Sequence, residues 1–325
     1  MKAYLLKLSL FIGLALLPLC MLEGLMRRPQ ADHLSAKRAF LDENRNTCET
    51  IILGSSYALT GLNPEWIGEQ CLNLSNASQP YYYDYHILSK YAPRMPALQT
   101  VILPLSYPMF FVKPEKRQDN LYHIYLDLPP CSGKKTIESY SVVLALGLKN
   151  AFDQWRTGED FYVNRGWVGN TSTFDGSDEK LQLRLNVMHS FMAPENFDEN
   201  VRIFRQIVET CKQRNLRLVL YLSPMLEAYE RALADDQPYR DKYDRLMAEL
   251  AKDKSLEIYD LNNREVFGPA CFRDPDHLNV RGAKILSEMI RSILANRPDT
   301  SVVRLLSQNH DLLAQPKITL FKNSN

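Results

Sequence analysis

The sequence lacks several patterns by which common classes of protein are recognised. Its 39 lysines and arginines are balanced by 38 aspartates and glutamates, and no basic block concentrates them. This argues against a nucleic-acid partner. No two of the six cysteines form a C-x-x-C pair, so zinc and thioredoxin-like sites are not predicted. The chain also has no G-x-G-x-x-G or Walker pattern, which makes a nucleotide-binding domain a distant alternative. We find no internal repeat and no low-complexity block.

Long hydrophobic runs are also scarce, and the clearest one lies at the N-terminus. Residues 8–22 carry no charge and are flanked by Lys7 and Glu23. In length this run fits the core of a signal peptide, since a full membrane span needs about 20 residues. However, no A-x-A-like cleavage site is present, and residues 4–26 are long enough to cross a bilayer. We therefore predict an uncleaved membrane anchor in residues 1–28, with a cleaved signal sequence as the alternative.

The charges around this run do not fix its orientation, because basic residues flank it on both sides. The cysteines bear on the compartment instead. Cys48 and Cys71 each precede a short apolar run, and if those runs form parallel neighbouring strands the two thiols could bridge. Such a disulfide would fit an oxidising, extracytoplasmic location. Scattered buried thiols in a cytoplasmic domain are the alternative.

Beyond the anchor, the chain has the organisation of one α/β domain. Residues 29–47 are polar and are expected to form a stalk, and residues 48–295 alternate short aliphatic runs with amphipathic stretches. The alternation predicts a parallel sheet covered by helices on both faces. The expected strands are residues 50–53, 72–74, 100–105, 217–222 and 256–261, and the expected helices are residues 81–91, 197–214, 239–250 and 280–294.

Two segments depart from this rhythm. Residues 110–194 contain a predicted helix at 137–155 and a segment rich in Gly, Asn and Ser at 166–177. They are too long for a plain crossover, so we predict an insertion that packs over one end of the sheet, where insertions often form lids or substrate walls. Residues 296–325 have no clear period and are expected to form a loosely attached tail.

The residues that follow the predicted strands indicate the chemistry, because doubly wound sheets bind ligands outside the carboxyl ends of their strands. Gly54-Ser55-Ser56 follows the first strand, and Asp274-x-x-His277 lies beyond the last. A serine becomes a nucleophile when a base takes its proton and a third group fixes the tautomer of that base. We predict Ser56 as the nucleophile, His277 as the base and Asp274 as the orienting group. Taken alone, each motif could be an ordinary turn.

These two motifs resemble those of a known family. Gly54-Ser55-Ser56 resembles the first block of the SGNH (GDSL-like) hydrolase superfamily, with Ser55 in place of the family's Asp. The segment from Asp274 through Pro275, Asp276 and His277 resembles its final D-x-x-H block. The anchor and the variant first block are similar to the cell-envelope branch, which includes the D-alanyl transfer protein of teichoic acids and the alginate O-acetyltransferases.

The resemblance implies a flavodoxin-like three-layer α/β/α sandwich with a central parallel sheet. It also implies a membrane-anchored serine esterase or O-acyltransferase whose catalytic domain lies outside the cytoplasm. The substrate would be an acyl ester of an envelope polysaccharide or glycolipid, and a membrane-bound O-acyltransferase would be a partner. No cofactor is expected. Asp274, Asp276 and His277 could also be metal ligands, but no second histidine is placed to join them, so no metal site is predicted.

The chain departs from the family where an oxyanion would be held. The Ser56 N–H at a helix start is one expected donor. The family's glycine in the second block is missing, which leaves only the backbone N–H of Ala77 or Ser78, and Ser106 is nearest the expected place of the family's Asn. These losses favour acyl transfer over broad esterase activity. They also fit the alternative function, a non-catalytic module that binds glycan or a membrane acyltransferase.

Four further residues are candidates for lining the substrate site: Tyr57, Tyr82, His189 and Asn279. Tyr82 belongs to a cluster of tyrosines that could stack on a sugar ring, although aromatic packing at a helix start explains the cluster equally well. His189 would reach the site from the insertion, and a structural histidine is the alternative.

Overall fold

The computed structural model describes residues 1–27, 33–157, 163–234, 239–296 and 304–305. Its contacts divide the chain into two compact units. The first comprises Met1–Ala39 and Pro114–Phe161, and the second comprises Phe40–Lys113 and Tyr162–Asn325. The α2 helix (His33–Asn44) contains the first boundary between them. Each unit is described by itself.

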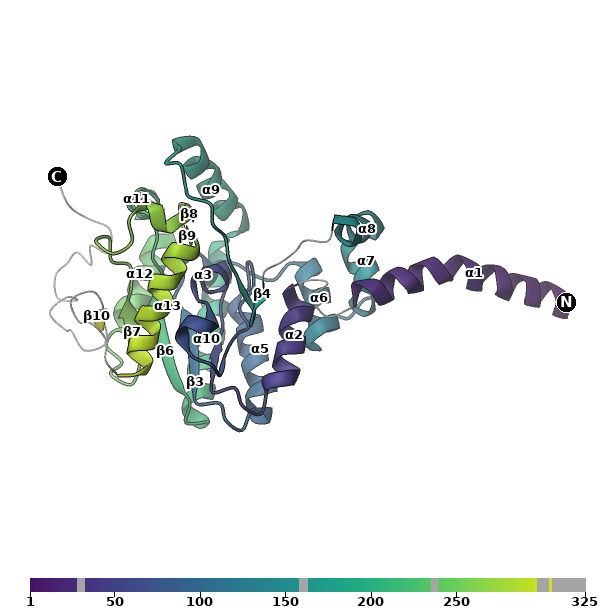
Figure 1. Cartoon of the computed structure of the whole chain (residues 1–325), viewed down its shortest axis with the longest axis horizontal. Helices are drawn as coiled ribbons and strands as arrows, with labels where there is room; N and C mark the ends of the chain where they lie inside the picture. The colour runs from purple at the N-terminus through teal and green to yellow at the C-terminus, as the bar shows by residue number, and fades with distance from the viewer. Residues whose placement is uncertain (28–32, 158–162, 235–238, 297–303, 306–325) are drawn as a thin grey trace. The chain divides into compact units, whose positions relative to one another are not determined.

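Within the described residues, the second unit is built on a six-stranded sheet with the strand order β10-β7-β6-β3-β1-β2. Figure 1 labels β10, β7, β6 and β3 of this sheet. The pairs β2–β1, β1–β3, β3–β6 and β6–β7 are parallel, and β10 pairs with β7 in the antiparallel direction. The strands are β1 (Thr50–Ile52), β2 (Cys71–Asn73), β3 (Thr100–Pro104), β6 (Arg217–Leu222), β7 (Glu257–Asp260) and β10 (Arg304–Leu305). The order of the parallel strands is that of flavodoxin-like folds, so the predicted fold class is confirmed.

These short strands form because their side chains are buried on both faces of the sheet. Ile52 pairs in register with Ile102 on β3, which in turn pairs with Val219 on β6. All three side chains are completely buried and belong to one apolar cluster. Aliphatic runs without polar alternation are what a parallel sheet between two helical layers requires.

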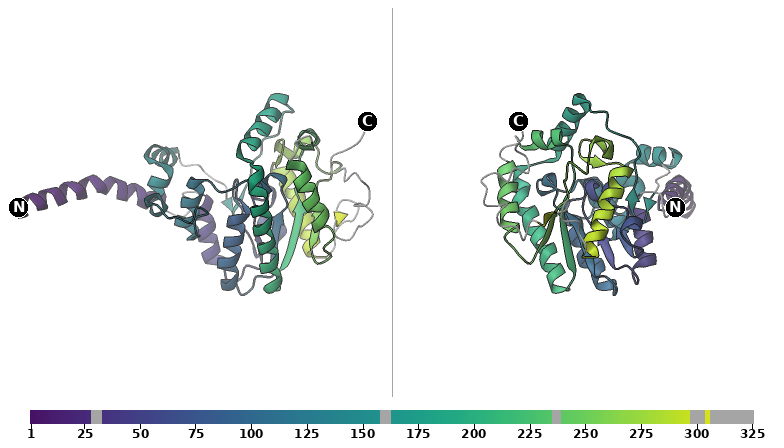
Figure 2. Two further views of the ribbon diagram at one scale, coloured as in Figure 1. Left: turned by 180° about the vertical axis from the view of Figure 1, so that it is seen from behind. Right: turned by 60° about the vertical axis from the view of Figure 1, so that its left-hand side comes forward.

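Helices cover both faces of this sheet (Figure 2). The helices of the second unit are α3 (Ser56–Gly61), α4 (Pro64–Ile67), α5 (Tyr81–Tyr91), α9 (Asp178–Phe191), α10 (Phe197–Gln213), α11 (Glu227–Ala234), α12 (Tyr239–Leu250) and α13 (Val280–Leu294), with short 3-10 turns η1 (Ala92–Arg94), η2 (Tyr107–Phe110), η4 (Pro194–Asn196) and η5 (Pro269–Cys271). On one face α13 packs against α3 and α4 over the Ile52 cluster. On the other, α5 packs against α10 through contacts of the Tyr81 ring with those of Phe110 and Phe204.

Two hairpins and α9 complete the second unit. The first hairpin joins β4 (Val163–Asn164) to β5 (Trp167–Val168), and the second joins β8 (Phe272–Asp274) to β9 (His277–Leu278). The carbonyl of Arg165 in the first hairpin accepts the Asn73 N–H at the end of β2. Neither hairpin was predicted, because pairs of two to three residues leave no periodic signal.

The first unit contains the N-terminal apolar helix. Its helices are α1 (Lys2–Met26), α6 (Lys116–Leu126), η3 (Ile137–Tyr140), α7 (Val142–Leu146) and α8 (Leu148–Thr157). Among the described residues, α1 alone is long and apolar enough to cross a membrane, and none of its most apolar stretch is buried. A membrane anchor and a signal sequence both have these properties.

The helix predicted at residues 137–155 is interrupted in the structure. The chain forms η3, then α7 and α8, with Gly147 between the last two in a left-handed conformation (φ +79°). The Ser141 hydroxyl accepts the N–H of Leu144, which caps the start of α7. Glycine and a capping serine are both helix-end signals, and they overrode the hydrophobic periodicity on which the prediction relied.

Other predictions concern the ends of the chain and its cysteines. The predicted stalk contains α2, whereas residues 28–32 and most of the C-terminal tail lie outside the described residues. Cys48 and Cys71 are both buried with free thiols. Their strands are parallel neighbours as expected, but Thr50 stands opposite Cys71 in the register, so the two cysteines are not paired across the sheet.

Candidate active site

The site begins at the turn between β1 and α3, where Ser56 is the first helical residue. Gly54 has a left-handed backbone (φ +111°), and a Cβ atom there would lie 2.6 Å from the Pro104 ring on β3. A side chain would therefore both strain the backbone and overlap a neighbouring strand. The turn places Ser56 at the carboxyl edge of the sheet, as the sequence predicted.

A buried carboxyl group holds this turn. The Asp84 Oδ1 on α5 accepts the Gly54 N–H at 2.7 Å and the Gln79 side-chain amide at 2.5 Å. Asp84 is completely buried, and its Oδ2 has no hydrogen-bond partner among the described residues. Burial raises the pKa of Asp84 to about 7 in spite of the two hydrogen bonds. A role for Asp84 was not predicted from the sequence.

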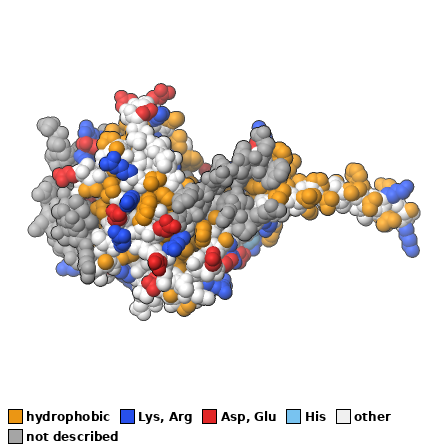
Figure 3. Space-filling view, viewed as in Figure 1, with side chains coloured by type: hydrophobic (Ala, Val, Ile, Leu, Met, Phe, Trp, Pro, Cys, Tyr) orange, Lys and Arg blue, Asp and Glu red, His pale blue; other side chains and the backbone are white. Residues whose placement is uncertain are grey.

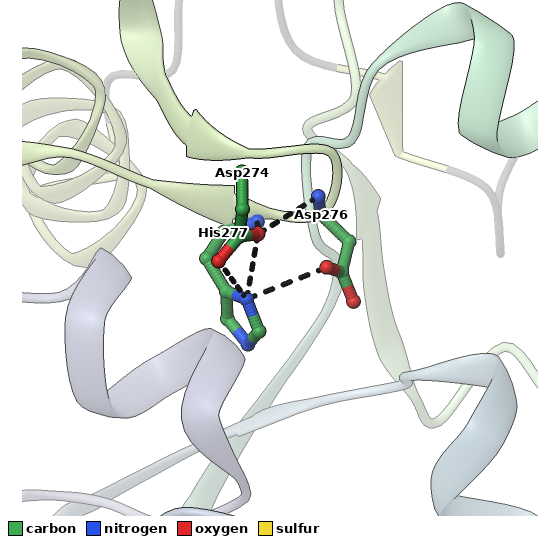
Figure 4. Close-up of side chains that lie close together, drawn as sticks. All are labelled: Asp274, Asp276 and His277. Atoms are coloured by element: carbon green, nitrogen blue, oxygen red, sulfur yellow. Dashed lines mark hydrogen bonds and ion pairs between the residues drawn. The ribbon is translucent and has the colours of Figure 1, made fainter. Parts of the chain in front are cut away.

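The β8–β9 hairpin supplies the acid and the imidazole. The Asp274 Oδ1 accepts the backbone N–H of His277 at 2.9 Å, which closes the turn, and lies 2.8 Å from Nδ1 of the His277 ring. Figure 4 shows both carboxylate oxygens of Asp274 facing this nitrogen. Burial acts to raise the pKa of Asp274, but the hydrogen bond from His277 and the charges of His277 and Arg273 hold it well below its usual range. Asp274 is therefore an ionised acceptor at neutral pH.

The structure brings the two motifs together. His277 Nε2 lies 2.7 Å from the Ser56 Oγ. An ionised carboxylate can only accept hydrogen bonds, so the His277 Nδ1 carries the proton and donates a hydrogen bond to Asp274. The His277 Nε2 is then free to accept a hydrogen bond from the Ser56 hydroxyl. The Tyr57 ring stacks on the His277 ring with a centroid distance of 5.4 Å, which further restricts the imidazole. This arrangement can activate a serine for attack on an ester.

A second carboxylate lies beside the imidazole. Asp276 is completely buried, and its Oδ1 lies 3.4 Å from His277 Nδ1. The Tyr57 hydroxyl donates to its Oδ2 at 2.8 Å. Arg184 on α9 donates to Oδ1 from Nε at 2.6 Å and to Oδ2 from Nη2 at 2.9 Å. This bidentate pair neutralises a charge that burial alone would strongly disfavour.

The acidic cluster bears on the metal hypothesis. Ligand atoms of Asp274, Asp276 and His277 lie within 4.8 Å of one another, a spacing that could suit a metal ion. However, the Arg184 guanidinium binds both oxygens of Asp276, and a cation would have to compete with it. The His277 Nδ1 is likewise engaged by Asp274. The arrangement favours an orienting role for this cluster.

Neither Arg184 nor Asp84 was predicted from the sequence. Arg184 lies 92 residues before Asp276 on a helix that no pattern predicted, and Asp84 lies within a helix-start cluster of tyrosines. Only Asp84 could have been predicted from the sequence. A carboxylate among large apolar side chains is costly to bury without a partner, so its place in the tyrosine cluster indicates a hydrogen-bonding role.

The oxyanion candidates differ in their surroundings. The Ser56 N–H opens α3, where first-turn N–H groups have no partner within the helix. The Ala77 N–H donates to the Asn76 side chain at 3.0 Å, and Ser78 is exposed in a left-handed conformation (φ +51°). The Ser106 hydroxyl is buried without a hydrogen-bond partner among the described residues.

The four candidate substrate-lining residues also lie in different settings. Tyr57 is buried against His277, and Tyr82 is half-buried with its ring 4.4 Å from that of His86. His189 is exposed on the last turn of α9. The Asn279 side chain is buried, accepts the N–H groups of Arg281 and Gly282, and donates to the carbonyl of Ala270. These bonds make Asn279 the N-cap of α13.

Comparisons with known proteins found likeness in structure alone. No protein-family model matches the chain, and no curated protein matches it. A candidate acylhydrolase from Bacteroides fragilis NCTC 9343 superposes with a TM-score of 0.39 at 10% identity, over 77% of this chain and 88% of that one. A candidate platelet activating factor from Streptococcus pneumonia superposes with a TM-score of 0.40 at 11% identity, over 85% of this chain and 98% of that one. At such low TM-scores neither likeness bears on function.

Replacing Arg184 tests the buried ion pair. We expect Arg184→Met to lower the free energy of unfolding by about 3 kcal/mol, because it leaves Asp276 charged, buried and without its bidentate partner. Adding Asp276→Asn should recover part of this loss, since it removes the unpaired charge. Chemical denaturation measures both effects. Arg202→Met is the matched control, because its partner Glu199 is exposed, and it should cost no more than about 0.5 kcal/mol. Equal losses for the two arginine variants would contradict this account.

Replacing Asp84 tests the buried carboxyl group. Its folded-state pKa is raised, so the folded protein binds the proton more tightly than the unfolded chain. The stabilisation is complete below the unfolded pKa of about 4 and is lost as the pH rises through about 7. Between about pH 4 and about pH 7 the wild type should lose on the order of 1 kcal/mol per pH unit relative to Asp84→Asn, and above about pH 7 the two profiles should run parallel. Denaturation of both proteins at about pH 4.5 and about pH 7, which lie within the interval between the two pKa values, measures the difference, and parallel profiles over this interval would contradict it.

Proposed function

We propose that this protein is a membrane-anchored serine esterase or O-acyltransferase that acts on acyl esters of a cell-envelope polysaccharide or glycolipid. The observation that carries the proposal is the chain of contacts from Ser56 Oγ to His277 Nε2 and from His277 Nδ1 to Asp274. Such a chain combines a nucleophile, a base and an orienting acid, which are the parts needed for acyl transfer through a covalent intermediate.

In the proposed reaction the Ser56 hydroxyl attacks the ester carbonyl while His277 Nε2 takes its proton. The negative charge that develops on the carbonyl oxygen is stabilised by the Ser56 N–H at the start of α3. His277 then returns the proton to the leaving alcohol, and the acyl group stays on Ser56. Water or an acceptor hydroxyl completes the reaction by the same steps in reverse, with His277 again as base.

The finer parts of this proposal rest on different grounds. The anchor rests on the length and apolar character of α1. The extracytoplasmic location, the envelope substrate and a membrane-bound O-acyltransferase partner rest on the resemblance of the Ser56 and His277 motifs to the envelope branch of SGNH hydrolases. Transfer is favoured over hydrolysis because a second oxyanion donor is weakly provided at Ala77, whose N–H already donates to Asn76.

A second function is favoured by the same weakness. The Ala77 N–H already donates to Asn76, so an oxyanion would gain few backbone donors beyond Ser56. One such donor can be worth about 3 kcal/mol of transition-state stabilisation. A non-catalytic module that keeps the fold and binds glycan or a membrane partner is therefore the alternative.

Labelling with a fluorophosphonate separates the two functions. We expect the full chain to be labelled at Ser56 and both Ser56→Ala and His277→Ala to lose the label, because the reagent reacts with an activated serine. Asp274→Asn should slow labelling by about 10³–10⁴-fold through loss of the correct tautomer. Gel fluorescence against time measures these rates.

Ser55→Ala is the matched control for this experiment. The Ser55 hydroxyl is completely buried beside Ser56 and has no hydrogen-bond partner among the described residues. Its removal should leave labelling within about twofold of the wild type, in line with an uninvolved hydroxyl. Absence of labelling in a folded wild type would favour the non-catalytic module.

A further inference from the structure

The carboxylate of Glu23 joins the last turn of α1 to the start of α7. It accepts hydrogen bonds from the Ser141 hydroxyl at 2.7 Å, the Val142 N–H at 3.0 Å and the Val143 N–H at 3.1 Å. Arg27 pairs with the same carboxylate at 2.5 Å. These charge-assisted bonds satisfy first-turn N–H groups of α7 and hold it against α1.

This junction fixes the depth at which α7 would lie. Glu23 is the first charged residue after Lys7, so it marks the end of the apolar part of α1. A helix of 25 residues is about 37 Å long, whereas the hydrocarbon core of a bilayer is about 30 Å thick. If α1 spans a bilayer, its last turn lies at the headgroup level, and α7 begins at the same level.

The segment from Ile137 to Phe152 carries an exposed row of large apolar side chains, which we call the apolar row. Ile137 and Tyr140 of η3 are 74% and 60% exposed, Leu144 of α7 is 47% exposed, and Leu148 and Phe152 of α8 are 57% and 48% exposed. The residues between them include Val142, Val143, Leu146 and Ala151, which are buried within the unit. The segment therefore has enough apolar residues both to pack inward and to leave a second apolar surface uncovered.

A lipid surface suits the apolar row better than a protein groove. Most of the row lies on α7 and α8, which both pack against α1 (Figure 1), and apolar side chains run along α1 without cover (Figure 3). Tyrosine is favoured at the headgroup level, and the exposed Lys149 beside Leu148 can reach the lipid phosphates. Soluble monomeric proteins rarely leave large apolar surface exposed unless it binds a membrane or a partner.

We propose that the apolar row of η3, α7 and α8 lies in the lipid–water interface of the membrane that α1 crosses. The first unit then holds to the bilayer at two places, one spanning and one interfacial, so that α1 cannot tilt or rotate independently of α7 and α8. This inference rests on the membrane anchor of the proposed function.

Depth-dependent fluorescence quenching tests the proposal on the full chain in phosphatidylcholine–phosphatidylglycerol vesicles. Cys20→Ser and Cys131→Ser remove the exposed thiols, and the other four cysteines are buried. Leu144→Cys, Leu148→Cys or Phe152→Cys then carries a nitrobenzoxadiazole label, and Gln182→Cys on the exposed surface of α9 is the matched control. Spin-labelled lipids should quench the three test positions about threefold more than the control, most strongly with the quencher about 5–10 Å below the headgroups.

Each other outcome overturns the proposal in a distinguishable way. Equal quenching at the three test positions and at Gln182→Cys, in protein that floats with the vesicles, would place the apolar row outside the lipid while leaving the anchor intact. The same result together with crosslinks from position 148 to a membrane protein in cells would assign the row to a protein partner. Failure of the protein to float with vesicles would overturn the anchor and the apolar row together, without affecting fluorophosphonate labelling.

Discussion

The parallel pairing of β1 with β3 is the constraint on which the site depends. Because both strands end at the same edge, the turn after β1 must pass over Pro104 of β3, and only a glycine at position 54 fits that approach. The turn then delivers Ser56 to the first position of α3. The Asp84 carboxylate on α5 accepts the Gly54 N–H. Gly54 is therefore fixed both by its close approach to Pro104 on β3 and by its hydrogen bond to α5. The pairing of β1 with β3 therefore determines the geometry of the turn, and the turn determines the position of Ser56.

The orientation of the His277 imidazole is fixed by a few contacts within the β8–β9 hairpin. Asp274 closes its own hairpin turn through the His277 N–H and binds the ring nitrogen with the same carboxylate. Asp276, two residues away, faces that nitrogen as well, and its charge is balanced by Arg184 from α9. Two carboxylates therefore share one imidazole with different roles: Asp274 orients it, whereas Asp276 ties α9 to the hairpin. The ion pair between Arg184 and Asp276 therefore links α9, the helix that precedes α10 in the chain, to the site.

The parts of this arrangement that follow from local pattern could be predicted from the sequence. The aliphatic runs of β1, β3 and β6 and the amphipathic stretches of α5, α10, α12 and α13 have the periods that their burial requires. Ser56, Asp274 and His277 were predicted as a group, because the residues that follow parallel strands lie at one edge of the sheet. Arg184 and Asp84 were not, since their importance comes from partners distant in sequence, and Gly147 showed that a helix break can overrule periodicity.

The measurement that tests the central claim most directly is the intact mass of the full chain after brief exposure to an activated acyl ester, followed by peptide mapping. An activated Ser56 should gain one acyl group, and the acylated peptide should contain Ser56. The acyl group should be absent from His277→Ala at the same exposure, because the unassisted hydroxyl is a weak nucleophile. Acylation confined to other residues, or equal acylation of Ser56 in the wild type and in His277→Ala, would contradict the assignment of Ser56, His277 and Asp274 as an acyl-transfer site.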